Sequence, residues 1–166
     1  MQSSVRVGVL VLSTIVLLAG CDAPRDDGTA VSSRVRLDSS QADAQFGEYV
    51  VRVSGLLTSD LTPEIAQTYG IVRSESRGFV NLVLLRKDAA TGAEAPVKAN
   101  VTLSASNLTG QLKNTVIKEI EAADSIYYIV EVEVTDREII NFDFDVRPVD
   151  SNRVLQVRFT QEFYGR

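Results

Sequence analysis

The chain has 166 residues, a formal net charge of −5, one cysteine, one methionine, and neither histidine nor tryptophan. Because the methionine is Met1, the rest of the chain carries no imidazole and no thioether side chain. This composition excludes serine–histidine and cysteine–histidine nucleophilic mechanisms, and it disfavours zinc, copper or haem sites built on His, Cys or Met. We therefore expect no cofactor, although oxygen ligands could still bind calcium or magnesium. The lack of a dense basic run argues against a nucleic-acid partner.

The first twenty residues predict an export signal. Arg6 supplies one positive charge before Val7–Gly20, a run that is apolar apart from Ser13 and Thr14. Its 14 positions are too few for a membrane-spanning helix, which needs about 20 residues. A charged start, a short apolar run and small residues before the cleavage point are typical of signal peptides. We therefore predict a signal peptide over residues 1–20.

The end of this run resembles the lipobox of bacterial lipoproteins. It reads Leu18-Ala19-Gly20-Cys21, and in such a motif the cysteine thiol is acylated and the chain is cleaved before the cysteine. Two or three acyl chains, at about 0.8 kcal/mol per buried methylene, hold a protein stably on a membrane. We therefore predict lipid attachment at Cys21, a membrane as the first partner, and a periplasmic location. Asp22 resembles the inner-membrane retention signal of enterobacterial lipoproteins, so the inner membrane is favoured, with the outer membrane as the alternative.

Residues 21–44 are predicted to be the lipidated cysteine and a flexible tether, because Asp, Ser, Gly, Ala and Arg dominate them. A weak alternation in Val31–Leu37 leaves an added edge strand as an alternative. The folded domain is predicted over residues 45–166. Since Cys21 is the only cysteine, that domain has no disulfide and depends on its hydrophobic core.

Hydrophobic residues alternate with period two through the domain, which predicts strands. The expected strands are Glu48–Leu57, Phe79–Leu85, Val97–Ala105, Gln111–Glu121, Ile126–Val134, Ile140–Val146 and Val154–Phe163. Among them, the nearly continuous apolar run Phe79–Leu85 is expected to be buried on both faces. The Gln111–Glu121 segment also fits a helix stripe, but its β-branched residues favour a strand.

One short helix is predicted, with Thr62 as its N-cap, Pro63 at its first position and Gly70 after its end. It falls in the first connection between the predicted strands. The expected fold is therefore all-β: an immunoglobulin-like antiparallel β-sandwich of about seven strands with one short helix.

Several segments together resemble a family of small exported proteobacterial proteins, domain of unknown function 4426. They are Phe46–Val51, Leu61–Ala66, Tyr69–Ser74, Arg77–Asn81, Ile126–Ile129, Phe142–Pro148 and Phe163-Tyr164. The resemblance covers nearly all of the domain and implies a periplasmic β-sandwich, but it supplies no activity. The lipobox would then be a local variation, since many members have a plain signal peptide.

The long connection between Thr58 and Gly78 carries a candidate binding loop made of Tyr69, Arg73 and Arg77. Two guanidinium groups near a tyrosine could bind a carboxylate or a phosphate-like group. Alternatively, both arginines pair with surface carboxylates and simply fix the loop.

An acidic set, Glu131, Glu133, Asp143 and Asp145, shares the outward positions of two consecutive strands. If these strands form a hairpin, the four carboxylates would be a weak candidate calcium site. Alternatively, Asp143 pairs with Arg158 across the last hairpin, or the two strands belong to different sheets and the set is divided. Glycosidase chemistry would need a concave pocket beside such a pair.

These observations predict no enzyme. The expected function is a membrane-anchored periplasmic lipoprotein whose sandwich is a non-catalytic binding or adaptor module for an envelope protein. The alternative is a small-ligand or calcium-binding envelope module, and a carboxylate-based hydrolase is disfavoured.

Overall fold

The computed structural model describes residues 34–165. The predicted signal peptide, Cys21, Asp22 and the first part of the predicted tether lie outside these residues. The described residues fall within one compact unit, Val31–Arg166. No helix in the described part of the chain has the length and apolar character needed to cross a membrane.

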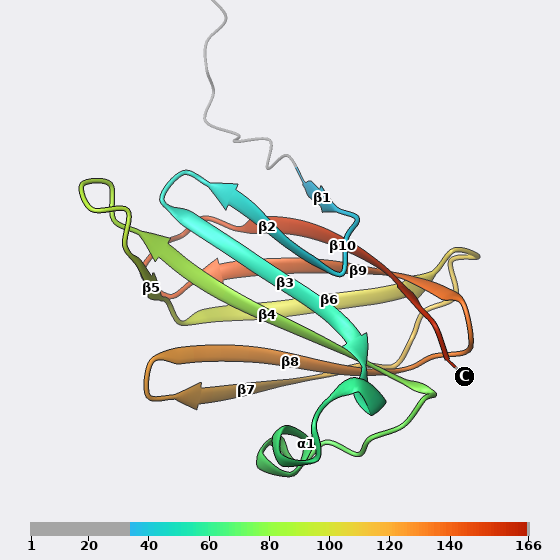
Figure 1. Ribbon diagram of the computed structural model, residues 1–166. Coiled ribbons are helices and arrows are strands. Elements are labelled where there is room, and N and C mark those ends of the chain that lie inside the picture. The colour runs from blue at the N-terminus through green and yellow to red at the C-terminus, as the bar shows by residue number, and fades with distance from the viewer. Residues whose placement is uncertain (1–33, 166) are drawn as a thin grey trace, which may run out of the picture. The chain divides into compact units, whose positions relative to one another are not determined.

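Two β-sheets pack face to face, with one short helix at the edge of the assembly (Figure 1). The four-stranded sheet has the order β1 (Val35–Leu37), β10 (Leu155–Phe163), β9 (Glu138–Pro148), β6 (Ala99–Asn107). The six-stranded sheet has the order β2 (Gln41–Phe46), β3 (Tyr49–Leu57), β4 (Arg77–Lys87), β8 (Ser125–Glu133), β7 (Val116–Ala122), and β5 (Glu94–Pro96) also pairs with β4. All pairs are antiparallel except β1 with β10. The predicted all-β sandwich is confirmed, and β1, β2 and β5 add to the seven expected strands.

The inward faces predicted from period two form the core. Phe142, Phe144 and Phe159 are each fully buried, and the Phe142 ring lies 6.1 Å from Phe159 and 6.3 Å from Phe163, centroid to centroid. Phe163 needs a glycine opposite it, because a Cβ on Gly78 would lie 2.8 Å from its ring. The core therefore combines large aromatic side chains of one sheet with small residues of the other.

The helix forms where its capping residues predict it. The 3-10 turn η1 (Thr58–Asp60) leads into α1 (Pro63–Tyr69) between β3 and β4. The Thr62 hydroxyl accepts a hydrogen bond from the Ile65 N–H, and Gly70 ends the helix in the left-handed region at φ +64°. A second, smaller hydrophobic cluster joins this region to the outer face of the six-stranded sheet.

The expected burial of Phe79–Leu85 on both faces is only partly correct. Phe79 is buried in the second cluster beneath the helix region, whereas Val83 and Leu85 are half-buried. The physical reason is length: a helix of seven residues covers only one end of the outer face.

The boundary predicted between tether and domain is also corrected, because β1 and the first four residues of β2 lie in residues assigned to the tether. β1 pairs in parallel with β10, and Leu37 and Ala44 are buried in the core. Arg34 donates a hydrogen bond to Asp143 over 2.9 Å. These contacts are long-range, so a short polar segment showed no sign of them beyond the alternation in Val31–Leu37.

The segment predicted over Gln111–Glu121 is a strand only from Val116 onward, which confirms the strand alternative for its second half. The preceding stretch, residues 108–115, passes from the four-stranded sheet to the six-stranded sheet. Within this stretch, Leu112 forms an isolated β-bridge to Ser106 on β6. We name residues 111–115 the crossing segment, since it positions the candidate site.

Candidate functional site

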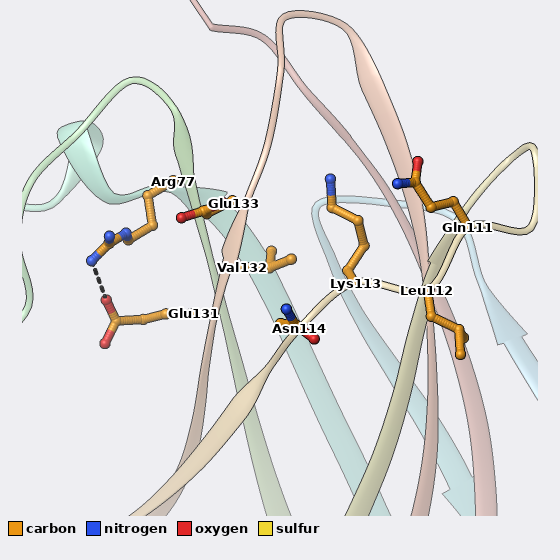
Figure 2. Close-up of a pocket in the computed structure, with 8 residues that line it drawn as sticks. All are labelled: Arg77, Gln111, Leu112, Lys113, Asn114, Glu131, Val132 and Glu133. Atoms are coloured by element: carbon orange, nitrogen blue, oxygen red, sulfur yellow. Dashed lines mark hydrogen bonds and ion pairs between the residues drawn. The ribbon is translucent and has the colours of Figure 1, made fainter.

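A polar groove opens where β7 and β8 separate. β7 pairs with β8 as far as Val116, which lies opposite Glu131. Upstream of Val116 the crossing segment turns away to reach β6, so the last residues of β8 lose their neighbour on that side. The resulting groove has a volume of about 360 Å³ (Figure 2). Its lining residues are Arg77, Gln111, Leu112, Lys113, Asn114, Glu131, Val132 and Glu133.

The groove continues past the end of β8. An adjoining hollow of about 410 Å³ shares Arg77, Lys113 and Glu133 with it and is also lined by Ser76, Val134 and Thr135. The two hollows together follow the line where β4, β8 and the crossing segment meet.

One charged group in the groove is Glu131, which is held by two cations. Arg77 Nη1 lies 3.4 Å from Glu131 Oε2, and Lys118 Nζ lies 2.7 Å from Glu131 Oε1. Figure 2 shows the Arg77 and Glu131 side chains directed toward each other. Glu133 lies directly opposite Arg77 in the pairing of β4 with β8. The Glu131 carboxylate therefore already has two cationic partners within the protein.

The second charged group is the pair Lys113–Glu138, which ties the crossing segment to the start of β9. Lys113 Nζ donates to both Glu138 oxygens over 2.9 and 3.0 Å, and the side chains are only 17% and 12% exposed. The Thr135 N–H also donates to Glu138 over 2.9 Å. Burial alone would raise the pKa of Glu138, but the hydrogen bonds from Lys113 and Thr135 outweigh it and lower that pKa. The lowered pKa favours the ionised form of Glu138.

Of the three residues predicted to form a binding loop, only Arg77 lines the groove. Tyr69 packs edge-to-face on Tyr127, with ring centroids 6.3 Å apart. Arg73 Nη2 donates to the Ser59 carbonyl over 2.5 Å and so joins the loop to η1. Arg73 thus fixes the loop, as the structural alternative expected, but its partner is a backbone carbonyl rather than a carboxylate.

The acidic set is divided, because β8 and β9 belong to different sheets. Glu131 and Glu133 lie on the outer face of one sheet, and Asp143 and Asp145 lie on the outer face of the other. The expected hairpin and its four-carboxylate calcium site are therefore not formed. Within residues 34–165 no three carboxylates gather in a way that could hold a metal ion.

Asp143 instead pairs with Arg158, as the alternative expected. Arg158 Nε and Nη2 each donate to the Asp143 carboxylate over 2.8 Å. These hydrogen bonds lower the pKa of Asp143 despite its partial burial. Asp145 accepts a hydrogen bond from Gln156 over 3.0 Å.

Sequence reasoning missed Gln111, Lys113 and Asn114 as groove residues, and it missed Glu138 as the partner of Lys113. The one available signal was the conflict between helix and strand periodicity over Gln111–Glu121, which marks a segment that follows neither pattern throughout. Nothing in the sequence links Lys113 to Glu138, because they meet only when the two sheets pack.

The comparisons with known proteins fit this fold. A family model described as "Domain of unknown function (DUF4426)" matches residues 43–165. Among solved structures, the chain is similar to a DUF4426 family protein from Pseudomonas aeruginosa PAO1, with 26% sequence identity and a TM-score of 0.64. The match covers 76% of this chain and 97% of that chain. Nothing among curated proteins matches the chain.

Proposed function

We propose that this chain, which belongs to the family described as Domain of unknown function (DUF4426), is a membrane-anchored periplasmic lipoprotein whose sandwich is a non-catalytic binding module. The observation that carries the proposal is Leu18-Ala19-Gly20-Cys21 at the end of a short apolar run. Lipid on Cys21 holds the protein on the envelope membrane, and its partner is another envelope protein. Asp22 favours the inner membrane.

The chemistry of the groove supports binding rather than catalysis. A general acid or base needs a group that can exchange a proton with a substrate near neutral pH. Here Glu131 is engaged by Arg77 and Lys118, and Glu138 by Lys113 and Thr135. The chain also has no histidine. A groove of this kind can hold polar or charged groups of a partner by exchanging these internal pairs for intermolecular ones.

A small polar ligand is the second candidate. The amide side chains of Gln111 and Asn114 line the groove beside Arg77, and such groups can orient a small molecule by hydrogen bonds.

The anchor is tested by labelling cells with an alkyne-bearing fatty acid and separating membranes from soluble protein. The parent chain should carry the label and sediment with membranes, whereas Cys21→Ser should lose the label. The matched control, Asp22→Ser, keeps the thiol and should keep the label. It should also move toward outer-membrane fractions if Asp22 is a retention signal. A Cys21→Ser protein that is labelled like the parent contradicts the lipid anchor.

The binding role is tested by photo-crosslinking in cells. A photoreactive residue at Asn114, in the groove, should capture a defined envelope protein. The same residue at exposed Asn152, in the β9–β10 turn, serves as the control and should not capture it. Equal capture from both positions, or none from Asn114, contradicts binding at the groove.

A further inference from the structure

β6 leaves part of its backbone open along one edge. In the described part of the chain it pairs along its length with β9 alone and is the last strand of its sheet. In an antiparallel pair, alternate residues direct their N–H and C=O groups toward the partner strand or away from it. Lys98 bonds toward β9, since its carbonyl accepts the Val149 N–H over 2.9 Å. The odd-numbered residues of β6 therefore face the open edge.

Both ends of this edge are closed by the protein itself. At one end the Tyr128 hydroxyl donates to the Ala99 carbonyl over 2.9 Å and accepts the Ala99 N–H over 2.7 Å. At the other end the Lys113 N–H donates to the Ala105 carbonyl over 2.9 Å, and the Asn107 N–H donates to Gln111. The backbone groups of Val101 and Leu103 remain open between these two closures, which hold them in extended geometry.

β6 lacks the features that protect sheet edges against pairing. Its nine residues contain no charge and no proline, although natural edge strands are usually short, charged or interrupted. The other edge strands follow the rule: β1 and β5 have three residues each, β2 carries Asp43, and β7 carries Lys118, Glu119 and Glu121. The open edge of β6 is therefore an exception within this fold.

Side chains beside the open edge are apolar and only half-buried. Val101 and Leu103 point inward and pack on the core together with Ile117 of β7 and Ile126 of β8. An added strand would direct every second side chain into this seam between the sheets. Apolar side chains at those positions would complete the burial of Val101 and Leu103.

Charge is unbalanced at the Tyr128 end of the edge. Lys98 Nζ lies 2.7 Å from Glu119 and 2.5 Å from Glu121, so one ammonium faces two carboxylates. The whole chain is also acidic, at −5. A bound segment with a lysine or arginine at this end would balance the excess negative charge.

A second copy of this chain does not fit the edge. Antiparallel pairing of two β6 strands about Thr102 places Ala99 of each copy opposite Ala105 of the other. Those positions are already occupied by the Tyr128 hydroxyl and by Lys113. The crossing segment of each copy would also occupy the path of the other strand.

We propose that β6 binds an extended peptide segment of a partner protein as an added strand of the four-stranded sheet. Val101 and Leu103 supply the backbone hydrogen bonds, and alternate apolar side chains of the segment enter the seam. A basic residue of the segment lies near Glu119 and Glu121. This inference rests on the proposed binding role and names its partner as an extended, apolar and basic segment.

The test uses the compact unit Val31–Arg166 and a synthetic peptide, Lys-Val-Thr-Val-Lys, with blocked ends. Its two valines would lie opposite Val101 and Leu103, and its length keeps it between the two closed ends of the edge. Amide hydrogen exchange is followed by NMR with and without the peptide. In the free domain the Val101 and Leu103 amides should exchange quickly, while the Thr102, Ser104 and Ala99 amides are protected. Saturating peptide should slow exchange at Val101 and Leu103 by about tenfold or more, because each gains a hydrogen bond. A peptide with proline in place of either valine should have no effect, because proline has no N–H to donate.

Val101→Pro removes one open N–H without touching the pairing with β9, and it should abolish the response. Val101→Thr keeps both the shape and the N–H, and it should respond like the parent. If Val101→Pro does not fold, Val101→Lys replaces it as an inward charge that blocks the edge.

Slow exchange of the Val101 and Leu103 amides in the free domain would overturn the proposal, and so would exchange that the peptide does not change. An equal response to the proline peptide would also overturn it. A fourth contrary result is a set of peptide-induced chemical-shift changes confined to Arg77 and Glu133. The last result would leave the groove as the binding surface, so the proposed binding role would survive without the added strand. If the parent chain carries no lipid in the labelling experiment, the proposed membrane location is wrong. The hydrogen-exchange test of β6 does not depend on that result.

Discussion

The Tyr128 hydroxyl offers a direct test of how the two sheets are joined. It is the side-chain group that satisfies both the N–H and the C=O of Ala99 at the start of β6. Tyr128 is 2% exposed and Ala99 is 3% exposed. Replacement of Tyr128 by phenylalanine keeps the buried ring and removes only the oxygen, leaving two backbone groups without a partner.

An unsatisfied buried hydrogen-bonding group costs about 1–3 kcal/mol. Because Ala99 lies at a sheet edge that water can approach after small movements, we take the lower half of this range for each group. Tyr128→Phe should then lower the free energy of unfolding by about 2–4 kcal/mol. For a domain of this size, that corresponds to a fall in melting temperature of about 7–14 °C.

The assay is urea unfolding of the Val31–Arg166 unit, followed by far-ultraviolet circular dichroism because the chain has no tryptophan. Tyr127→Phe is the matched control. Its ring lies on the opposite face of β8 against Tyr69, and it should change stability by less than about 0.5 kcal/mol. The Ala99 amide should also lose its protection from exchange in Tyr128→Phe alone. Equal unfolding of the two variants would refute the role assigned to the Tyr128 hydroxyl.

Three further predictions follow from the core, the crossing segment and the loop. Phe144→Ala should lower the free energy of unfolding by about 3–5 kcal/mol, because the side chain is fully buried; an unchanged midpoint in urea would contradict the assigned strand face. Because the folded state lowers the pKa of Glu138, its contribution is present above the ordinary glutamate pKa and is lost as pH falls through the folded value. Acid titration of stability should therefore be shallower for Glu138→Gln than for the parent, and Lys113→Met should lose about 1–3 kcal/mol at neutral pH; parallel titration curves would contradict this pair. Arg73→Ala, which removes a bond to an exposed carbonyl, should cost under about 1 kcal/mol and leave crosslinking at the groove unchanged, whereas Arg77→Ala should weaken it; the reverse pattern would place binding on the loop.

Local features of the chain determined the strands, their inward faces and the helix. The alternation around Phe142 and Phe144 can be satisfied only if one face of the strand is buried, whatever lies opposite. Thr62 and Gly70 act through bonds and dihedral angles within a few residues, so their effect is visible in the sequence. The apolar run that ends at Cys21 is a local pattern too, although it lies outside the described residues.

Only the tertiary structure decided which strands are neighbours. Period two shows which side chains face the core, but it does not show in which of two sheets a strand lies. The acidic set was therefore divided when β8 and β9 entered different sheets, and Lys113 met Glu138 only because the crossing segment joins those sheets. β1 pairs with β10, more than 100 residues away in the sequence, and β2 forms a short hairpin with β3. Both strands have too few apolar residues for period two to predict them, apart from the weak alternation in Val31–Leu37. The groove arises where β7 ends and β8 continues, and the edge of β6 is open because β6 is the last strand of the four-stranded sheet. Both features exist only after the sheets have assembled.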